Sequence, residues 1–246
     1  MLALRAGEDD RQLYPKASVQ LDDPAIAGRL PAMAGVRIKI CGVTNSADAL
    51  AAARLGADAI GLNFYPPSPR YVDPARAPSL LQGLPPFLAV AGVFVNELLS
   101  QMVEKTQELG RLGIIQWHGA SQEPGYSHPF RLIPAFSVKD RSDLERIDRY
   151  LDACREREML PDALLLDAYD PIEFGGTGRT APWGLLADYR PGLPIILAGG
   201  LTPDNVAEAI RIVQPYAVDV ASGVESEPGI KDHDKMARFI ERVRSI

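Results

Sequence analysis

The sequence predicts a single α/β domain, a closed (β/α)8 barrel of the TIM-barrel class, with an extension in front of it. Eight short, nearly continuous apolar segments recur from Val36 onwards, which is typical of parallel strands covered by helices. Stretches with helical periodicity separate most of them. The eight units share residues 36–246, roughly 26 residues each, which is near the low end for this fold.

The predicted strands are rich in Val, Ile, Leu and Ala. In chain order they are VRIKI (36–40), AIGLNF (59–64), FLAVAGVFV (87–95), GIIQW (113–117), RLIPAF (131–136), ALLLD (163–167), PIILA (194–198) and AVDVA (217–221). An open doubly wound sheet is the main alternative, but such sheets usually have five or six strands. Eight repeats without a sign of a second domain favour the closed barrel.

The helices between the strands carry start and stop signals at their ends. The predicted boundaries are Asn45 or Ser46 to Gly56, Asn96 to Leu109 with Gly110 after it, a start at Asp140 or Ser142, a start at Thr202 with Pro203 in the first turn, and about Asp232 to Arg244. One unit is short, because 14 residues rich in glycine and proline separate Gln116 from Arg131. We therefore expect the fourth helix to be reduced to a turn or lost.

Residues 1–34 are polar and contain Pro15, Pro24 and Pro31 without a sustained period. We expect an N-terminal extension here, partly disordered, followed by the barrel domain at 35–246. The extension lacks the long apolar core of a signal peptide. No run of about 18 apolar residues predicts a membrane span.

Composition excludes several classes of function. The net charge of −6 does not favour nucleic-acid binding or a membrane surface, because both favour a basic face. Cys41 and Cys154 form no C-x-x-C pair and the three histidines are scattered, so we expect neither a metal site nor a disulfide framework. Free cysteines suit a reducing cytoplasm. An anionic ligand of this protein would be held by local backbone donors and a few arginines.

Active sites of such barrels lie at the carboxyl ends of the strands, where the sequence places Cys41, Gln116 and Asp167. A lone cysteine is more often a small buried hydrophobe, but Cys41 stands at the rim, and Gly42 lets the chain turn without covering the thiol. Asp167 follows three leucines, and desolvation there favours a raised pKa. Its alternative role is to accept hydrogen bonds from the loop that follows.

The turns after the seventh and eighth predicted strands contain Gly199 with Gly200, and Ser222 with Gly223. Many barrels of this class bind a substrate phosphate between these two loops through backbone amides. The alternative is that both are plain tight turns. The sequence therefore predicts a phosphate site here.

Two further loops carry candidate features. Three prolines surround Arg70 in NFYPPSPRYV, so the guanidinium is presented on a stiff loop and suits a carboxylate. The alternative is that Arg70 pairs with an acidic side chain on the protein surface. The glycine-rich stretch YDPIEFGGTGRTAPW, residues 169–183, lacks the spacing of a dinucleotide or P-loop motif. We expect it to form a mobile lid.

Taken in order, seven segments resemble the phosphoribosylanthranilate isomerase family of tryptophan biosynthesis. They are KICGVT, GLNFYPPSPRYV, GVFVN, QWHG, LLLD with FGGTG, LAGGLTPDNV and DVASGVESEPGIKD, and the resemblance runs in order from about Val36 to Ile246. Departures from the usual family pattern are Trp117 for leucine, Ala168 after the acid and Ala221 for serine. None of them touches the proposed proton-transfer pair.

The resemblance implies an Amadori rearrangement of N-(5′-phosphoribosyl)anthranilate without a cofactor. It implies that Cys41 is the general base, that Asp167 is the general acid, and that Arg70 holds the anthranilate carboxylate. Gly199, Gly200, Ser222 and Gly223 would hold the phosphate, and Gln116 belongs to the substrate-binding set. The chain would be a monomer or a homodimer.

Two other functions stay open at this point. A histidine-pathway isomerase of similar fold uses two aspartates, and Cys41 at the end of the first strand argues against it. A non-catalytic sugar-phosphate binder would keep the phosphate turns and lose the acid–base pair, yet Cys41 and Asp167 are both present.

The ionisation of Cys41 raises one more expectation. An unperturbed cysteine is only roughly 3% thiolate at pH 7. Lys39 lies two residues earlier on the same face of the strand, so its charge is a candidate for lowering the thiol pKa. The alternative is a buried lysine that pairs with an interior acid.

Overall fold

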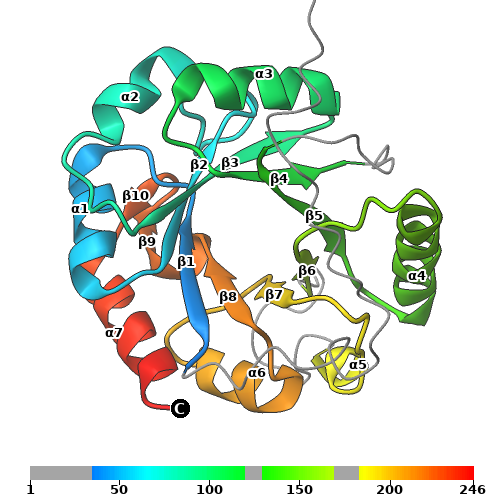
Figure 1. Cartoon of the computed structure of the whole chain (residues 1–246). Helices are drawn as coiled ribbons and strands as arrows, with labels where there is room; N and C mark the ends of the chain where they lie inside the picture. Colours follow the sequence, from blue (N-terminus) through cyan, green and yellow to red (C-terminus); the bar gives the residue numbers. More distant parts are fainter. Residues whose placement is uncertain (1–34, 120–128, 169–182) are drawn as a thin grey trace, which may run out of the picture. The chain divides into compact units, whose positions relative to one another are not determined.

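Eight parallel strands close into a barrel in a computed structural model that describes residues 35–119, 129–168 and 183–246. The strands are paired in sequence order and β1 also pairs with β8 (Figure 1). All eight predicted strands are confirmed and the open sheet is excluded. Their bounds are β1 Arg37–Cys41, β2 Ala59–Asn63, β3 Ala89–Val95, β4 Ile114–His118, β5 Arg131–Ser137, β6 Leu164–Asp167, β7 Ile195–Ala198 and β8 Ala217–Val220.

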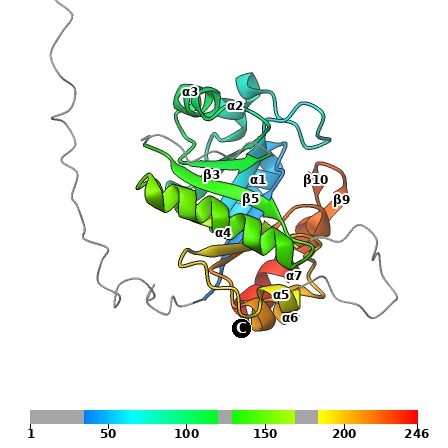
Figure 2. The same cartoon turned by 90° about the vertical axis from the view of Figure 1, so that its right-hand side faces the viewer.

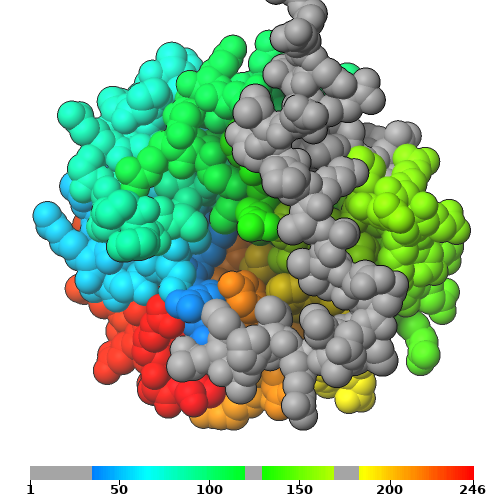
Figure 3. Space-filling view, in the orientation of Figure 1, coloured from blue at the N-terminus to red at the C-terminus, as the bar shows by residue number. Residues whose placement is uncertain are grey.

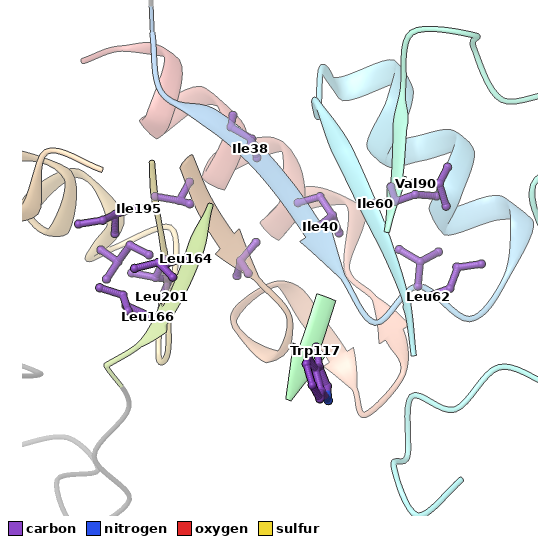
Figure 4. Close-up of a cluster of buried hydrophobic side chains, with 14 of the residues drawn as sticks. Ile38, Ile40, Ile60, Leu62, Val90, Trp117, Leu164, Leu166, Ile195 and Leu201 are labelled. Carbon is purple, nitrogen blue, oxygen red and sulfur yellow. The ribbon is translucent and has the colours of Figure 1, made fainter. Parts of the chain in front are cut away.

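Alternate residues of each strand face opposite sides of the barrel wall, which separates two apolar layers. The larger layer lies between the strands and the helices. Figure 4 shows part of it, including Ile38 and Ile40 on β1, both fully buried. A smaller cluster contains Ile133, Leu165 and Ile196 with several alanines, and it fills the barrel interior below the strand ends.

Helices surround the strands (Figure 1), and in the space-filling view the segments follow one another round the rim in chain order (Figure 3). Among the described residues, none of these helices is long and apolar enough to cross a membrane. Their bounds are α1 Ser46–Leu55, α2 Ala77–Leu80 after the 3-10 turn η2 Pro74–Arg76, α3 Leu99–Leu109, α4 Arg141–Glu156, α5 Trp183–Leu186, α6 Val206–Val213 and α7 His233–Arg244.

Most predicted helix ends are confirmed by their hydrogen bonds. Asn45 caps α1, Gly56 ends it in the left-handed conformation, and Asp140 caps α4 through a capping box. Two predicted starts are wrong. Asn96 has a φ of 55°, so α3 begins only at Leu99. The Thr202 hydroxyl accepts a hydrogen bond from Asp204 N in a turn of its own, and α6 begins at Val206.

A short antiparallel hairpin after β8, β9 (Glu225–Glu227) and β10 (Ile230–Lys231), was not predicted. It lies at one end of the barrel, directly before α7 (Figure 2). Three predictions lie outside the described residues: the N-terminal extension at 1–34, the reduced fourth helix, which falls on 120–128, and the glycine-rich lid at 169–182.

Candidate active site

All eight residues singled out in the sequence line one cavity of about 620 Å³ at the carboxyl ends of the strands. They are Cys41, Arg70, Gln116, Asp167, Gly199, Gly200, Ser222 and Gly223. The wall is completed by Gly42, Asn63, Val93, His118, Leu165, Ala198, Leu201, Thr202, Asp219, Val220 and Ala221. Residues from loops far apart in the sequence therefore meet at one site, as expected for this fold.

Cys41 is the last residue of β1, is partly exposed and lines the cavity. It packs against Gly61 of the neighbouring strand β2. A β-carbon built on Gly61 would lie 2.9 Å from Sγ of Cys41 and 3.1 Å from Nζ of Lys39. Glycine at this position therefore leaves room for both functional side chains.

Lys39 and Asp219 form a buried ion pair in the barrel interior, with Nζ 2.8 Å from Oδ1. The two residues face each other because β1 and β8 pair in register at this point. Burial opposes a charge on Lys39, but the neighbouring carboxylate and the Cys41 thiol raise its pKa. Lys39 is thus the buried, paired lysine that the sequence left as an alternative.

Lys39 acts on the thiol pKa of Cys41 in the expected direction, but the expected net lowering of that pKa is wrong. Burial and the Asp219 carboxylate raise the pKa of Cys41 above its ordinary value, against the opposite influence of Lys39 and Lys231. Lys39 does favour the thiolate, but burial, which is the largest cause, and the Asp219 carboxylate together outweigh it. The resting cysteine is therefore a thiol.

Asp167 ends β6, directly above the buried side chain of Leu165. Its backbone carbonyl accepts from Val138 N at 2.9 Å, which fixes the strand end. In the closed order of strands, β6 and β1 are separated by β7 and β8. The acid and the thiol therefore flank the arc that carries the two candidate phosphate turns.

These two turns touch each other. Gly199 and Gly200 follow β7 with φ angles of 92° and 61°, a region that favours glycine. Gly223 lies in the 3-10 turn η3 (Ser222–Val224) after β8, and a β-carbon there would collide with the carbonyl oxygen of Leu201. Both turns thus need glycine to form a continuous concave surface.

Gln116 and His118 occupy the end of β4 on the opposite side of the cavity from β8. Gln116 is 2% exposed, and its Nε2 lies 2.8 Å from Nε2 of His118. Burial and the charge of Lys39 lower the pKa of His118 to about 4. His118 is therefore neutral at pH 7 and accepts the hydrogen bond that the Gln116 amide donates.

Arg70 lies over Gly42, since a β-carbon on Gly42 would collide with its Cδ. Its guanidinium donates two hydrogen bonds to the buried carboxylate of Glu225, from Nε at 2.8 Å and from Nη2 at 2.6 Å. Arg70 thus has an acidic partner, but this partner is buried and is not the surface acid considered from the sequence. Sequence reasoning assigned no role to Glu225, although it lies within a quoted motif; no spacing rule links it to Arg70.

A closed barrel with a polar cavity at the carboxyl ends of its strands is the architecture of a (β/α)8-barrel enzyme. Comparison with known proteins specifies which one. A sequence model of N-(5′-phosphoribosyl)anthranilate (PRA) isomerase matches residues 38–242. The N-(5′-phosphoribosyl)anthranilate isomerase of Acidithiobacillus ferrooxidans is 48% identical over 213 residues, covering 85% of this chain and 98% of that protein. The chain belongs to the N-(5′-phosphoribosyl)anthranilate isomerase family.

Solved structures agree with this assignment. The phosphoribosyl anthranilate isomerase of Thermotoga maritima superimposes with a TM-score of 0.74 at 40% identity, covering 86% of this chain and all of that one. A phosphoribosyl anthranilate isomerase in complex with reduced 1-(o-carboxyphenylamino)-1-deoxyribulose 5-phosphate has a TM-score of 0.72 at 38% identity with the same coverage.

Proposed function

We propose that Cys41 and Asp167 act as general base and general acid in the reaction of this family. The chain is an isomerase of tryptophan biosynthesis that converts N-(5′-phosphoribosyl)anthranilate into 1-(2-carboxyphenylamino)-1-deoxyribulose 5-phosphate. In this Amadori rearrangement one carbon of the sugar is oxidised while its neighbour is reduced. Proton transfers alone achieve this, so the proposal needs no cofactor.

The acid acts first. The Asp167 carboxyl donates a proton to the ribose ring oxygen, the bond from that oxygen to the anomeric carbon breaks, and the anthranilate nitrogen forms a double bond to that carbon. The product of this step is a protonated Schiff base. The step requires a neutral carboxylic acid, and Asp167 ends the apolar strand β6, in which Leu165 is only 1% exposed.

The base acts second. The Cys41 thiolate removes the proton from C2, the electron pair moves to neutralise the Schiff base nitrogen, and the resulting enolamine tautomerises to the ketone. The resting thiol is protonated, because burial raises its pKa. The positive charge of the Schiff base beside the thiol then favours release of the thiol proton to solvent, which leaves the thiolate that removes the C2 proton.

The phosphate and the carboxylate of the substrate would each be bound, so that the ribose lies between Cys41 and Asp167. The turns at Gly199, Gly200, Ser222 and Gly223 would hold the phosphate through backbone N–H groups. Arg70 would hold the anthranilate carboxylate with the part of its guanidinium that Glu225 leaves open. Gln116, whose amide lines the cavity from β4, would contact the substrate from the opposite wall.

The observation that carries the proposal is the order of the groups round the barrel rim. Asp167 on β6 is followed by the turns after β7 and β8, then by Cys41 on β1 and by the Arg70 loop after β2. A phosphate held in the middle of this arc places the adjoining ribose between the acid and the base. Arg70, which would hold the carboxylate, follows the base in this order, on the side where the anthranilate ring would extend.

The test is complementation of a tryptophan auxotroph that lacks this isomerase, combined with turnover by the purified protein after dialysis against EDTA. Growth and undiminished turnover support the proposal. A folded protein that binds the substrate but neither turns it over nor restores growth would favour the non-catalytic binder instead.

We further propose a cytoplasmic location and a monomeric or homodimeric state. A solved relative from Thermotoga maritima is described as mutually generated monomers of a dimeric phosphoribosylanthranilate isomerase, with a TM-score of 0.71. Light scattering of the purified full chain distinguishes the two states. A larger assembly would contradict the proposal.

A further inference from the structure

We propose that Glu225 is a positioning residue that fixes the orientation of the Arg70 guanidinium for recognition of the substrate carboxylate. The inference rests on the carboxylate-binding role proposed above for Arg70. Glu225 itself is absent from the wall of the cavity, so it would act through Arg70 and not on the substrate.

Two hydrogen bonds between the side chains of Arg70 and Glu225 restrict the orientation of the guanidinium. Nε and Nη2 of Arg70 each donate to a different oxygen of the Glu225 carboxylate, at 2.8 and 2.6 Å. A fork-to-fork pair of this kind holds the guanidinium plane in that of the carboxylate. The side chain of Arg70 remains 24% exposed, whereas that of Glu225 is 5% exposed, so the exposed part of the pair is the arginine.

The guanidinium keeps a second donor edge. An arginine has five N–H groups, and the contact with Glu225 uses the N–H of Nε and one N–H of Nη2. Among the described residues, none accepts a hydrogen bond from Nη1 of Arg70. The edge formed by Nη1 and the other N–H of Nη2 is therefore available to a second carboxylate, in the cavity that Arg70 lines.

The Glu225 carboxylate is in turn held in place by Lys231. Nζ of Lys231, whose side chain is fully buried, donates to Glu225 Oε1 at 2.8 Å and to the carbonyl of Ala221 at 3.1 Å. Burial opposes ionisation of Glu225, but the hydrogen bonds from Arg70 and Lys231 lower its pKa below the ordinary value. The carboxylate thus stays charged and has little freedom to rotate.

The β9–β10 hairpin that carries Glu225 and Lys231 is attached to the loops next to the site. Thr44 Oγ1 donates to the carbonyl of Gly229 at 2.6 Å. A β-carbon on Gly229, whose φ is 88°, would lie 2.9 Å from the carbonyl oxygen of Pro69. The hairpin therefore packs directly on the residue before Arg70, and it links the turn after β8 to the loop after β2.

The experiment compares binding of two ligands by calorimetry. One is reduced 1-(o-carboxyphenylamino)-1-deoxyribulose 5-phosphate, and the other is the same molecule without its carboxyl group. The Kd of the ligand without the carboxyl group, divided by the Kd of the ligand that has it, measures carboxylate recognition separately from phosphate binding. We expect Arg70→Ala to bring the ratio close to one and Glu225→Gln to reduce it about tenfold, with the Kd of the ligand lacking the carboxyl nearly unchanged. In the Arg70→Ala background, Glu225→Gln should have no further effect on the ratio.

Two additional variants complete the design. Glu225→Asp keeps the charge but is too short to reach both donors of Arg70, so it should lower the ratio in the same direction if Glu225→Gln does not fold. Lys235→Met is the matched control, because Lys235 Nζ donates to the backbone carbonyl of Glu225 at 2.8 Å and not to its carboxylate. It should leave the ratio unchanged.

The outcomes separate the two proposals. A wild-type protein that binds both ligands equally would overturn the role of Arg70 and the inference with it. A wild-type protein that discriminates through Arg70, with an unchanged ratio in the folded Glu225 variants, would overturn the inference alone. An equal loss of affinity for both ligands in those variants would mean general structural damage and would also overturn it.

Discussion

The Lys39–Asp219 ion pair should control the ionisation of Cys41 with opposite signs at its two ends. Lys39→Met removes a cation and leaves the carboxylate, so the thiol pKa should rise. Asp219→Asn removes the carboxylate and leaves the cation, so the thiol pKa should fall. Both directions follow from the influence of these charges on Cys41 in the structure.

The magnitude follows from the distance between the charges. Sγ of Cys41 and Nζ of Lys39 lie 2.9 and 3.1 Å from the position that a β-carbon on Gly61 would occupy. The two atoms are therefore at most about 6 Å apart. A unit charge at about 6 Å contributes about 2.8 kcal/mol at an effective dielectric constant of about 20, which corresponds to about a 100-fold change in the thiolate population. Lys39→Met should therefore reduce the thiolate of Cys41 at pH 7 by about that factor.

The assay is the rate of alkylation of Cys41 by iodoacetamide between pH 6 and 9, read by mass spectrometry. Cys154, which is fully buried, serves as the internal control for unfolding. The double variant Lys39→Met/Asp219→Asn leaves no unpaired charge and should react at a rate between those of the single variants. Alkylation that slows in both single variants would refute the reasoning, because it would indicate a packing role in place of an electrostatic one.

Three further predictions concern the site. In Asp167→Asn the general acid is absent, so the pH profile of the residual kcat/KM reports the base alone. This kcat/KM should rise about tenfold per pH unit through neutrality, because the raised pKa of Cys41 keeps the thiol protonated there. A flat profile would argue against a thiolate base. Gly223→Ala should raise KM at least about tenfold through displacement of the Leu201 carbonyl, and competitive inhibition by inorganic phosphate should weaken in parallel; unchanged inhibition would contradict a phosphate role. Gly61→Ala should lower kcat more than it raises KM, because the added methyl group displaces the thiol; unaltered steady-state kinetics would show that the thiol position is not critical.

The strands and the rim residues could be predicted from sequence because they depend on local patterns. Apolar runs place the strands, and the end of each run places a residue such as Cys41 or Asp167 at the carboxyl edge of the barrel. The glycine-rich turns are equally local. The structure places all these residues on one cavity, while their chemical roles stay predictions.

What sequence could not provide was the pairing of charges across the barrel. Lys39 and Asp219 are 180 positions apart and meet only because β1 and β8 close the sheet. The expected net sign for the Cys41 pKa was wrong because burial of the thiol, the largest cause, and the Asp219 carboxylate outweigh the lysine. Glu225 and Lys231 were missed because β9 and β10 have three and two residues, too few for a period, and their polar side chains resemble an exposed loop.

The most direct test of the proposed mechanism is the steady-state kinetics of Cys41→Ala and Asp167→Asn, with turnover measured as the decrease in substrate fluorescence. The account predicts that each variant lowers kcat by at least about 100-fold, as expected for loss of a general acid or base, while KM changes little. Near-wild-type turnover by either variant would contradict the assignment of that residue.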